Sequence, residues 1–189
     1  MKVINIVPHT FSNRSILIKK AKKYRILIIT LILLVSALFY WPRRWKYIVI
    51  HHSAGSYGNI EHLQQVHRDR QPNDPIDAIA YHYIIGNGNG LEDGKVDSDF
   101  RKQYNIWGGH VRATNADKNF RGIGICIIGN LDEKDMTQAQ FNSLVRLTKE
   151  LMSKYGIRKE NILFHGEIEG EYTKCPGAKF PRKKYLNQL

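Results

Sequence analysis

The sequence predicts an α/β domain over residues 42–189, preceded by one N-terminal apolar helix. Segments typical of strands alternate with segments typical of helices from residue 45 onward, which is the pattern of α/β proteins. Charge is unevenly placed: residues 1–46 hold ten Lys or Arg and no acidic residue, whereas residues 47–189 hold 19 basic and 17 acidic residues. A hydrophobic content of 42% and a charged content of 24% exclude a disordered or collagen-like chain.

The N-terminal charges predict where the domain resides. An uncharged run covers residues 26–41, and seven of the ten basic residues precede it. Sixteen helical residues rise about 24 Å, slightly less than the roughly 30 Å of a hydrocarbon core. The charge bias favours a cytoplasmic N-terminus, with residues after the run outside the cytoplasm. We therefore expect a basic cytoplasmic leader at 1–25 and a single-pass transmembrane signal-anchor at 26–41, or alternatively a cleaved signal peptide and export.

The net charge of +12 does not indicate a nucleic-acid partner. The domain itself is close to neutral, with a net charge of +2, so the high isoelectric point reflects the N-terminal region. A compartment outside the cytoplasm permits a disulfide between the two cysteines. Cys126 stands in an apolar run typical of a buried strand, whereas Cys175 stands in the turn-forming context TKCPG. Cys175 is therefore the better candidate for a site.

The strands and helices are predicted from hydrophobic spacing and from residues that end elements. Asn59 is a plausible helix cap, and Gly156 a helix stop. Residues 97–120 and the tail after Cys175 show no strong period, and the basic run at 182–184 is expected to be solvated. Strands are expected at 45–52, 79–86, 123–128 and 161–165, a hairpin arm at 91–96, and helices at 60–70 and 137–155.

Side chains that can bind a metal follow two of these strands. His51 and His52 end the first strand, His165 follows the last, and Cys175 comes ten residues later. Zinc binds imidazole nitrogen and thiolate sulfur, and a catalytic zinc keeps three protein ligands and one open position. Two histidines and one cysteine would meet that requirement. If the segments are strands, His52 points away from His51 and serves packing, unless a bulge brings it to the metal instead.

Six segments together resemble the type 2 N-acetylmuramoyl-L-alanine amidases, a family that includes the peptidoglycan recognition proteins and phage lysozyme-type amidases. They are IVIHHSA, AYHYIIGNG, GGHVRATN, GIGICIIGN and FHGE with TKCPG, and they stand in the family's order over about residues 45–180. The resemblance implies a central mixed β-sheet flanked by helices. It also implies zinc-dependent cleavage of the amide between the muramic acid lactyl group and L-alanine of peptidoglycan or muropeptides.

The resemblance implies roles for particular residues. His51, His165 and Cys175 match the zinc ligands, and Tyr81 matches a catalytic tyrosine. Thr173 stands two residues before the cysteine, where recognition proteins commonly have threonine and phage enzymes lysine. Its hydroxyl and that of Tyr81 suit stabilisation of an oxyanion. Further matches to the groove region, expected to contact substrate, are His52, Trp107, His110, Asn115 and Lys174.

Two departures from the family pattern affect the choice of a general base. His165 and Cys175 are ten residues apart where the family usually has eight, and Cys126 stands where some bacterial relatives use a glutamate. No HExxH motif is present, which excludes a zincin glutamate. Tyr81 acting through a bound water is the first choice for the base, and Glu167 the second.

Two other functions are kept as alternatives. The first is a non-catalytic peptidoglycan-binding module on the same fold. Cys175 disfavours it, because family members that lost catalysis typically lack this cysteine. The second is a membrane-anchored basic protein that binds nucleic acid or anionic lipid through its N-terminal region, which the neutrality of the domain disfavours.

Overall fold

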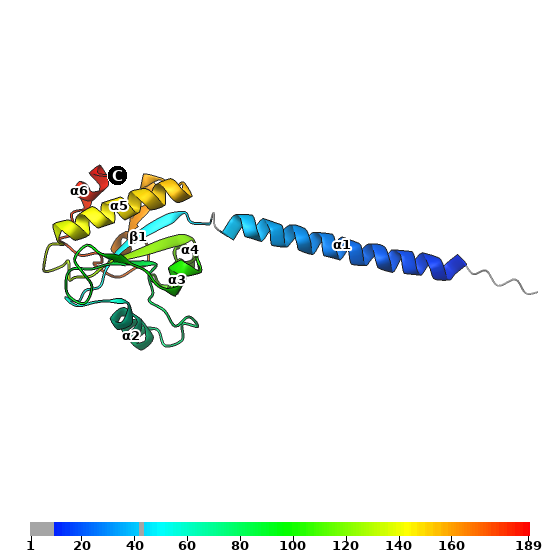
Figure 1. Ribbon diagram of the computed structural model, residues 1–189, viewed down its shortest axis with the longest axis horizontal. Coiled ribbons are helices and arrows are strands. Elements are labelled where there is room, and N and C mark those ends of the chain that lie inside the picture. The colour runs from blue at the N-terminus through cyan, green and yellow to red at the C-terminus, as the bar shows by residue number, and fades with distance from the viewer. Residues whose placement is uncertain (1–9, 42–43) are drawn as a thin grey trace, which may run out of the picture. The chain divides into compact units, whose positions relative to one another are not determined.

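In the computed structural model, the described residues are 10–41 and 44–189, and the chain divides into two units, Met1–Arg43 and Arg44–Leu189 (Figure 1). The first unit contains helix α1 (Thr10–Tyr40). Lys2 and Arg43 of the basic N-terminal region, and the side chains of residues 38 and 39 within the expected membrane segment, lie outside the description.

The expected transmembrane helix is not supported. No helix within the described ranges is both long enough and apolar enough to cross a membrane.

The second unit is built on a five-stranded mixed sheet with the strand order β3-β2-β4-β1-β5. Four strands are parallel, and β3 pairs antiparallel with β2 as the arm of the expected hairpin. This confirms the mixed sheet with flanking helices. The strands are β1 (Tyr47–His52), β2 (Tyr83–Ile85), β3 (Val96–Asp97), β4 (Gly122–Ile127) and β5 (Ile162–Phe164).

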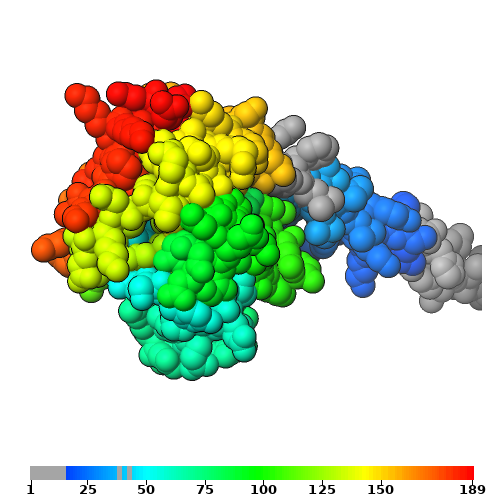
Figure 2. All heavy atoms as spheres, turned by 60° about the vertical axis from the view of Figure 1, so that its left-hand side comes forward, coloured from blue at the N-terminus to red at the C-terminus, as the bar shows by residue number. Residues whose placement is uncertain are grey.

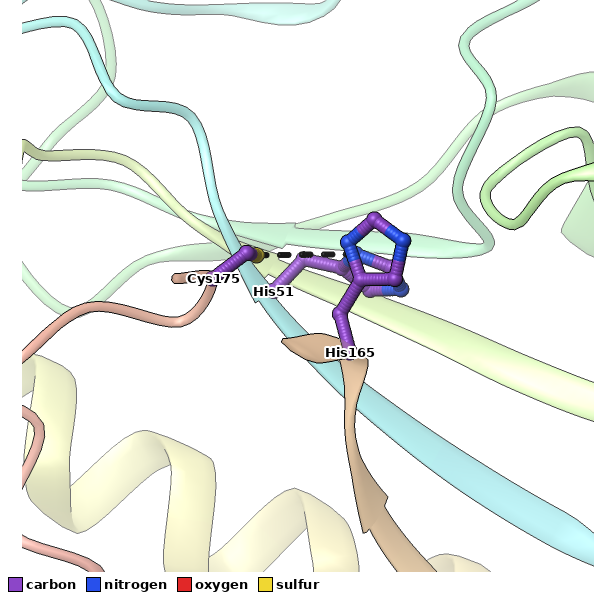
Figure 3. A group of neighbouring side chains, drawn as sticks. All are labelled: His51, His165 and Cys175. Atoms are coloured by element: carbon purple, nitrogen blue, oxygen red, sulfur yellow. Dashed lines mark hydrogen bonds between the residues drawn. The ribbon is translucent and has the colours of Figure 1, made fainter. Parts of the chain in front are cut away.

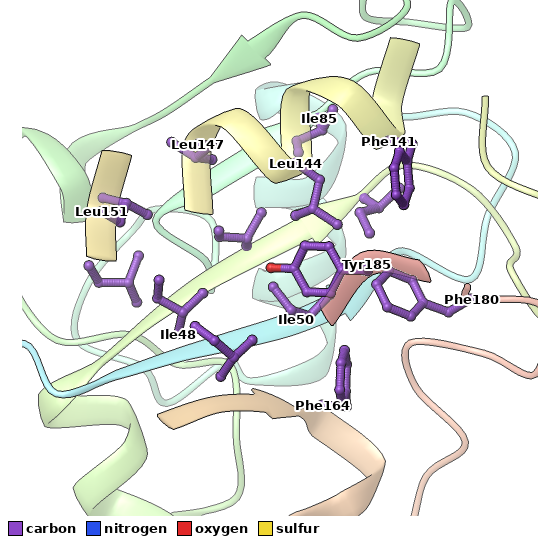
Figure 4. Packing of buried hydrophobic residues seen from close by; sticks show 14 of the residues in the cluster. Ile48, Ile50, Ile85, Phe141, Leu144, Leu147, Leu151, Phe164, Phe180 and Tyr185 are labelled. Atoms are coloured by element: carbon purple, nitrogen blue, oxygen red, sulfur yellow. The ribbon is translucent and has the colours of Figure 1, made fainter. Parts of the chain in front are cut away.

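The two faces of the sheet pack against different helices. Helix α5 (Gln138–Tyr155) and helix α6 (Arg182–Asn187) lie over one face, and α2 (Ile60–Arg70) lies over the other (Figure 1). The main core, between the sheet and α5, contains the fully buried Ile48 and Ile50 of β1 (Figure 4). Because side chains alternate along a strand, His51 points to the opposite face, as does its register partner Cys126.

Both long helices of the domain have the ends that the sequence indicates. The Asn59 side chain accepts a hydrogen bond from the His62 amide and caps α2. Thr137 and Gln140 form a reciprocal capping box at α5, and Gly156 ends that helix in the left-handed conformation with φ 66°. These helices match their expected ranges closely.

Strand β2 is shorter than the expected range of 79–86. The Gly124 amide donates to the His82 imidazole Nδ1 rather than to a backbone carbonyl, so a side chain replaces one rung of the ladder. Residues 79–82 therefore approach the sheet without forming a regular strand, and β2 begins at Tyr83.

Three short helices fall in segments without a recognisable period. Helix α3 (Phe100–Gln103) lies within residues 97–120, and helix α4 (Ala116–Arg121) ends one residue beyond that segment. The third is α6, in which Lys183 and Lys184 of the basic run are exposed as expected, but the segment is a helix and not a free tail. Tyr185 of α6 is fully buried and shares a 2.7 Å hydrogen bond with Thr148 of α5, so the C-terminal segment packs on α5 (Figure 2).

Candidate metal centre

Parallel strand ends bring the two histidines together. Strand β1 lies between β4 and β5, and it runs parallel to β5. His51 stands near the end of β1, and His165 directly follows β5, so both lie at the same edge of the sheet. Their ring centroids are 4.5 Å apart. Register is continuous along β1 from Tyr47 to His52, so no bulge replaces His51 by His52.

Cys175 completes the group from the loop after β5. The donor atoms of His51, His165 and Cys175 lie within 4.8 Å of one another, and all three side chains converge (Figure 3). The Cys175 Sγ is 3.8 Å from His51 Nδ1 and accepts a hydrogen bond from the His52 amide at 3.3 Å. Ligands held tetrahedrally at about 2.0 to 2.3 Å from zinc stand roughly 3.3 to 3.6 Å apart. The 3.8 Å between Cys175 Sγ and His51 Nδ1 is close to that spacing, and a pair as far apart as 4.8 Å would have to close by about 1 Å around the ion.

The second ring nitrogen of each histidine is already bonded to a neighbour. His51 Nε2 lies 3.1 Å from His110 Nδ1, and His165 Nε2 lies 3.0 Å from an oxygen of Glu171. Both rings therefore keep Nδ1 for another partner. Histidines that bind metals are commonly held this way, because the outer hydrogen bond fixes the tautomer and the ring orientation.

Burial sets the protonation of the group. It lowers the pKa of His51 well below its ordinary value, with further lowering from His110 and His165. Burial also lowers the pKa of His165, although Glu171 partly offsets this effect. Both imidazoles are therefore neutral near pH 7, the form that binds a metal. Burial raises the pKa of the Cys175 thiol to about 12, so in the absence of a cation this group holds its proton.

Tyr81 lines the group from the segment before β2. Its ring centroid is 5.1 Å from that of His51, and its hydroxyl interacts with the Cys126 thiol. Burial raises the pKa of Tyr81 well above its ordinary value, so the phenol keeps its proton at neutral pH. A protonated phenol can donate a hydrogen bond but cannot serve as a base, which disfavours the base role expected for Tyr81.

The other expected catalytic and base residues lie on the loop between His165 and Cys175. Thr173 is exposed, and its Oγ1 accepts a hydrogen bond from the Cys175 amide at 3.1 Å. With Lys174 it lines a hollow of about 320 Å³. Glu167 pairs with Arg182 at 2.6 Å on the exposed side of the loop, so one of its carboxylate oxygens is bonded to Arg182 and not to a group of the metal centre.

Two of the expected substrate residues are engaged within the fold. His52 is buried, and its Nδ1 accepts a hydrogen bond from the Leu131 amide at 3.0 Å, in keeping with a packing role. Asn115 donates to the carbonyl of Glu169 and to a carboxylate oxygen of Glu171. Its amide nitrogen is thus fully used in holding the loop, and only its carbonyl remains for a ligand.

The remaining expected groove residues lie apart from one another. Trp107 lines a hollow of about 520 Å³ with residues of the 70–75 loop, whereas Asn115 lines a different one of about 730 Å³. His110 is buried against His51, and within the described residues its Nε2 has no hydrogen-bond partner.

Sequence reasoning missed Glu171 altogether. Its side chain is only 3% exposed, and it bonds to His165, Asn115 and the Arg112 amide. No spacing marks it, because it stands six residues after His165 in a loop. The signal that could have found it is chemical: a metal-binding histidine commonly needs a carboxylate or carbonyl on its second nitrogen.

Comparison with known proteins agrees with this geometry. A model of the N-acetylmuramoyl-L-alanine amidase family matches residues 41–178. Peptidoglycan-recognition protein SC2 of Drosophila melanogaster is 30% identical over 138 residues, which are 70% of this chain and 68% of that protein. The N-acetylmuramoyl-L-alanine amidase LysC from Clostridium intestinale is 27% identical with a TM-score of 0.65, over 79% of this chain and 87% of its own.

A recognition protein of the bumblebee, PGRP-SA, shares the fold with a TM-score of 0.55 and 23% identity, over 74% of this chain and 80% of its own. The family match covers well over half of the chain, and its bounds enclose every residue of the candidate metal centre. The chain therefore belongs to the type 2 N-acetylmuramoyl-L-alanine amidase family, which includes the peptidoglycan recognition proteins.

Proposed function

We propose that the protein is a zinc-dependent N-acetylmuramoyl-L-alanine amidase that cleaves the amide between the lactyl group of muramic acid and L-alanine. The observation that carries the proposal is the convergence of His51, His165 and Cys175, whose donor atoms lie within 4.8 Å of one another. Two neutral imidazoles and one thiol, held by separate elements of a buried edge, form the donor set of a three-ligand catalytic zinc site.

His51 and His165 would hold the ion through Nδ1, since Nε2 of each is bonded elsewhere, and Cys175 would hold it as a thiolate. When bound, zinc supplies a Lewis acid for the amide carbonyl and a water that ionises near neutral pH. The chain supplies the geometry around it. The His52 amide already donates to the Cys175 sulfur, which favours the charged form of that ligand.

Tyr81 and Thr173 have the chemistry to stabilise the tetrahedral oxyanion. The buried Tyr81 phenol beside His51 keeps its proton at neutral pH and can donate a hydrogen bond as negative charge develops. The Thr173 hydroxyl accepts from the Cys175 amide, which leaves its own proton available for donation. The donor role suits Tyr81 better than the role of base.

The alternative, a non-catalytic peptidoglycan-binding module, is supported by the similarity to peptidoglycan-recognition protein SC2. One experiment separates the two. The full-length protein, loaded with zinc, is incubated with purified peptidoglycan, and released stem peptides with a free L-alanine amine are measured by mass spectrometry. The amidase proposal predicts their release. Protein that sediments with the peptidoglycan but leaves it uncut would refute the amidase proposal and favour the binding module.

We also propose that the domain works outside the cytoplasm, because its proposed substrate is there and because basic residues precede the apolar run of residues 26–41. Cell fractionation with an antibody against the domain tests this. Recovery with the membrane indicates an anchor, and recovery of a shortened chain outside indicates a cleaved signal peptide. A full-length chain found only in the cytosol would contradict the proposal.

A further inference from the structure

Glu171 is the residue of this site to which sequence reasoning assigns no role, and its carboxylate is saturated with hydrogen bonds. One oxygen lies 3.0 Å from His165 Nε2. The other accepts from the Arg112 amide and from the Asn115 side chain, each at 2.8 Å. The side chain is 3% exposed, so these three contacts replace its hydration almost completely.

The bonding pattern fixes the proton of His165. The two donors on the other oxygen favour the ionised carboxylate, which can only accept, so His165 Nε2 carries the hydrogen in their shared bond. In a neutral imidazole the lone pair then resides on Nδ1. The His165 ring follows β5, and its centroid lies 4.5 Å from that of the His51 ring (Figure 3). The Nδ1 lone pair is therefore the one available to a metal bound by His51, His165 and Cys175.

We propose that Glu171 is a positioning residue for the metal centre, which holds His165 in the Nε2–H tautomer and in the orientation needed to bind zinc through Nδ1. Asn115 and the Arg112 amide in turn hold the carboxylate in place. The inference rests on the proposed function, because it explains how one of the three proposed zinc ligands is oriented. Outer hydrogen bonds of this type commonly change metal affinity by about 10- to 100-fold.

The loop that carries Glu171 also offers a matched control. Glu169 is two residues away and its side chain is exposed, and only its backbone carbonyl contacts Asn115. Glu171→Gln preserves the volume and removes the charge, whereas Glu171→Ala removes the acceptor entirely. Glu169→Gln makes the same chemical change on the same loop without touching His165.

The first measurement is the zinc affinity of the full-length protein, determined by competition with a chelating dye. We expect Glu171→Gln to weaken zinc binding by about tenfold and Glu171→Ala by about 100-fold, with Glu169→Gln at the wild-type value. Zinc affinity within twofold of wild type in both Glu171 variants would overturn the inference.

The second measurement reads the tautomer and does not require zinc. Side-chain nitrogen shifts of His165, recorded by NMR on metal-free protein, should show the Nε2–H form in wild type and in Glu169→Gln, and a mixture of tautomers in Glu171→Ala. A purely structural role of Glu171 would leave the His165 tautomer unchanged, and that result would also overturn the inference. If wild type binds no zinc, the proposed function fails, while this tautomer measurement still decides the role of Glu171.

Discussion

Acidification should destabilise the domain through His82, a fully buried histidine that bridges two backbone groups. Its Nδ1 accepts from the Gly124 amide at 3.0 Å, and its Nε2 donates to the Ile106 carbonyl at 2.9 Å. Only the neutral ring can make both bonds, because a protonated Nδ1 could no longer accept from the Gly124 amide. Burial accordingly lowers the pKa of His82 from 6.5 to about 3.

The sign and the size of the effect follow from this shift. In the unfolded chain His82 takes up a proton below pH 6.5, whereas in the folded state it stays neutral until about pH 3. The stabilisation is therefore complete above pH 6.5 and is lost as the pH falls. At about 1.4 kcal/mol per pH unit, lowering the pH from 7.5 to 5 should cost about 2 kcal/mol through this residue.

Urea unfolding of the full-length protein in the presence of a chelator measures this loss of stability, with tryptophan fluorescence, to which Trp45 contributes, as the reporter. Trp45 is 3% exposed, and its ring centroid is 4.8 Å from that of His82. Other buried histidines also titrate, so the quantity to compare is the difference between wild type and His82→Gln. The variant can keep a donor for Ile106 but leaves the Gly124 amide unpaired, which should cost about 1 to 3 kcal/mol at pH 7.5.

That difference should shrink by about 2 kcal/mol at pH 5, because the variant has no proton to take up at this position. His62→Gln, at an exposed histidine, is the control and should follow the wild-type pH dependence. Equal differences between wild type and His82→Gln at pH 7.5 and pH 5 would refute the reasoning.

Three further substitutions probe other parts of the account. Tyr81→Phe should lower kcat for amide cleavage by about 100- to 1000-fold at unchanged zinc content, and an undiminished kcat would remove the hydroxyl from the mechanism. Gly156→Ala should cost about 1 kcal/mol in urea unfolding because φ there is 66°; a neutral result would argue against the left-handed cap. Arg101→Leu should cost about 3 to 5 kcal/mol, since the buried guanidinium pairs with Asp74 at 2.5 Å and donates to two backbone carbonyls; a Tm within about 2 °C of wild type would contradict this.

The parts of the fold that the sequence predicts are those with a regular spacing. The apolar run before His51 and the stripe of α5 each impose a period on several residues, and Thr137 and Gly156 mark the ends of α5 chemically. Alternation along the first strand also places His51 and His52 on opposite faces. The meeting of His51 and His165 follows from the parallel strands, whose carboxyl ends share one edge of the sheet.

The parts that could not be predicted depend on single contacts. Tyr185 holds the six-residue helix α6 through its burial and its bond to Thr148, and six residues are too few to show a period. His82 shortens β2 by replacing one backbone acceptor. Arg44 is one of the ten basic residues of the N-terminal region, yet it is 2% exposed, with its guanidinium 3.8 Å from the centre of the Trp45 ring. Contacts of this kind arise only once the chain has folded.

The central claim is that His51, His165 and Cys175 form one catalytic zinc site, and a zinc titration of activity tests it most directly. Metal-free full-length protein is titrated with zinc while amide cleavage in a muropeptide is followed. The account predicts activity that rises linearly to one equivalent and then levels off, and almost no activity at any zinc level in folded Cys175→Ala. Full activity without zinc, or a wild-type titration curve in Cys175→Ala, would contradict it.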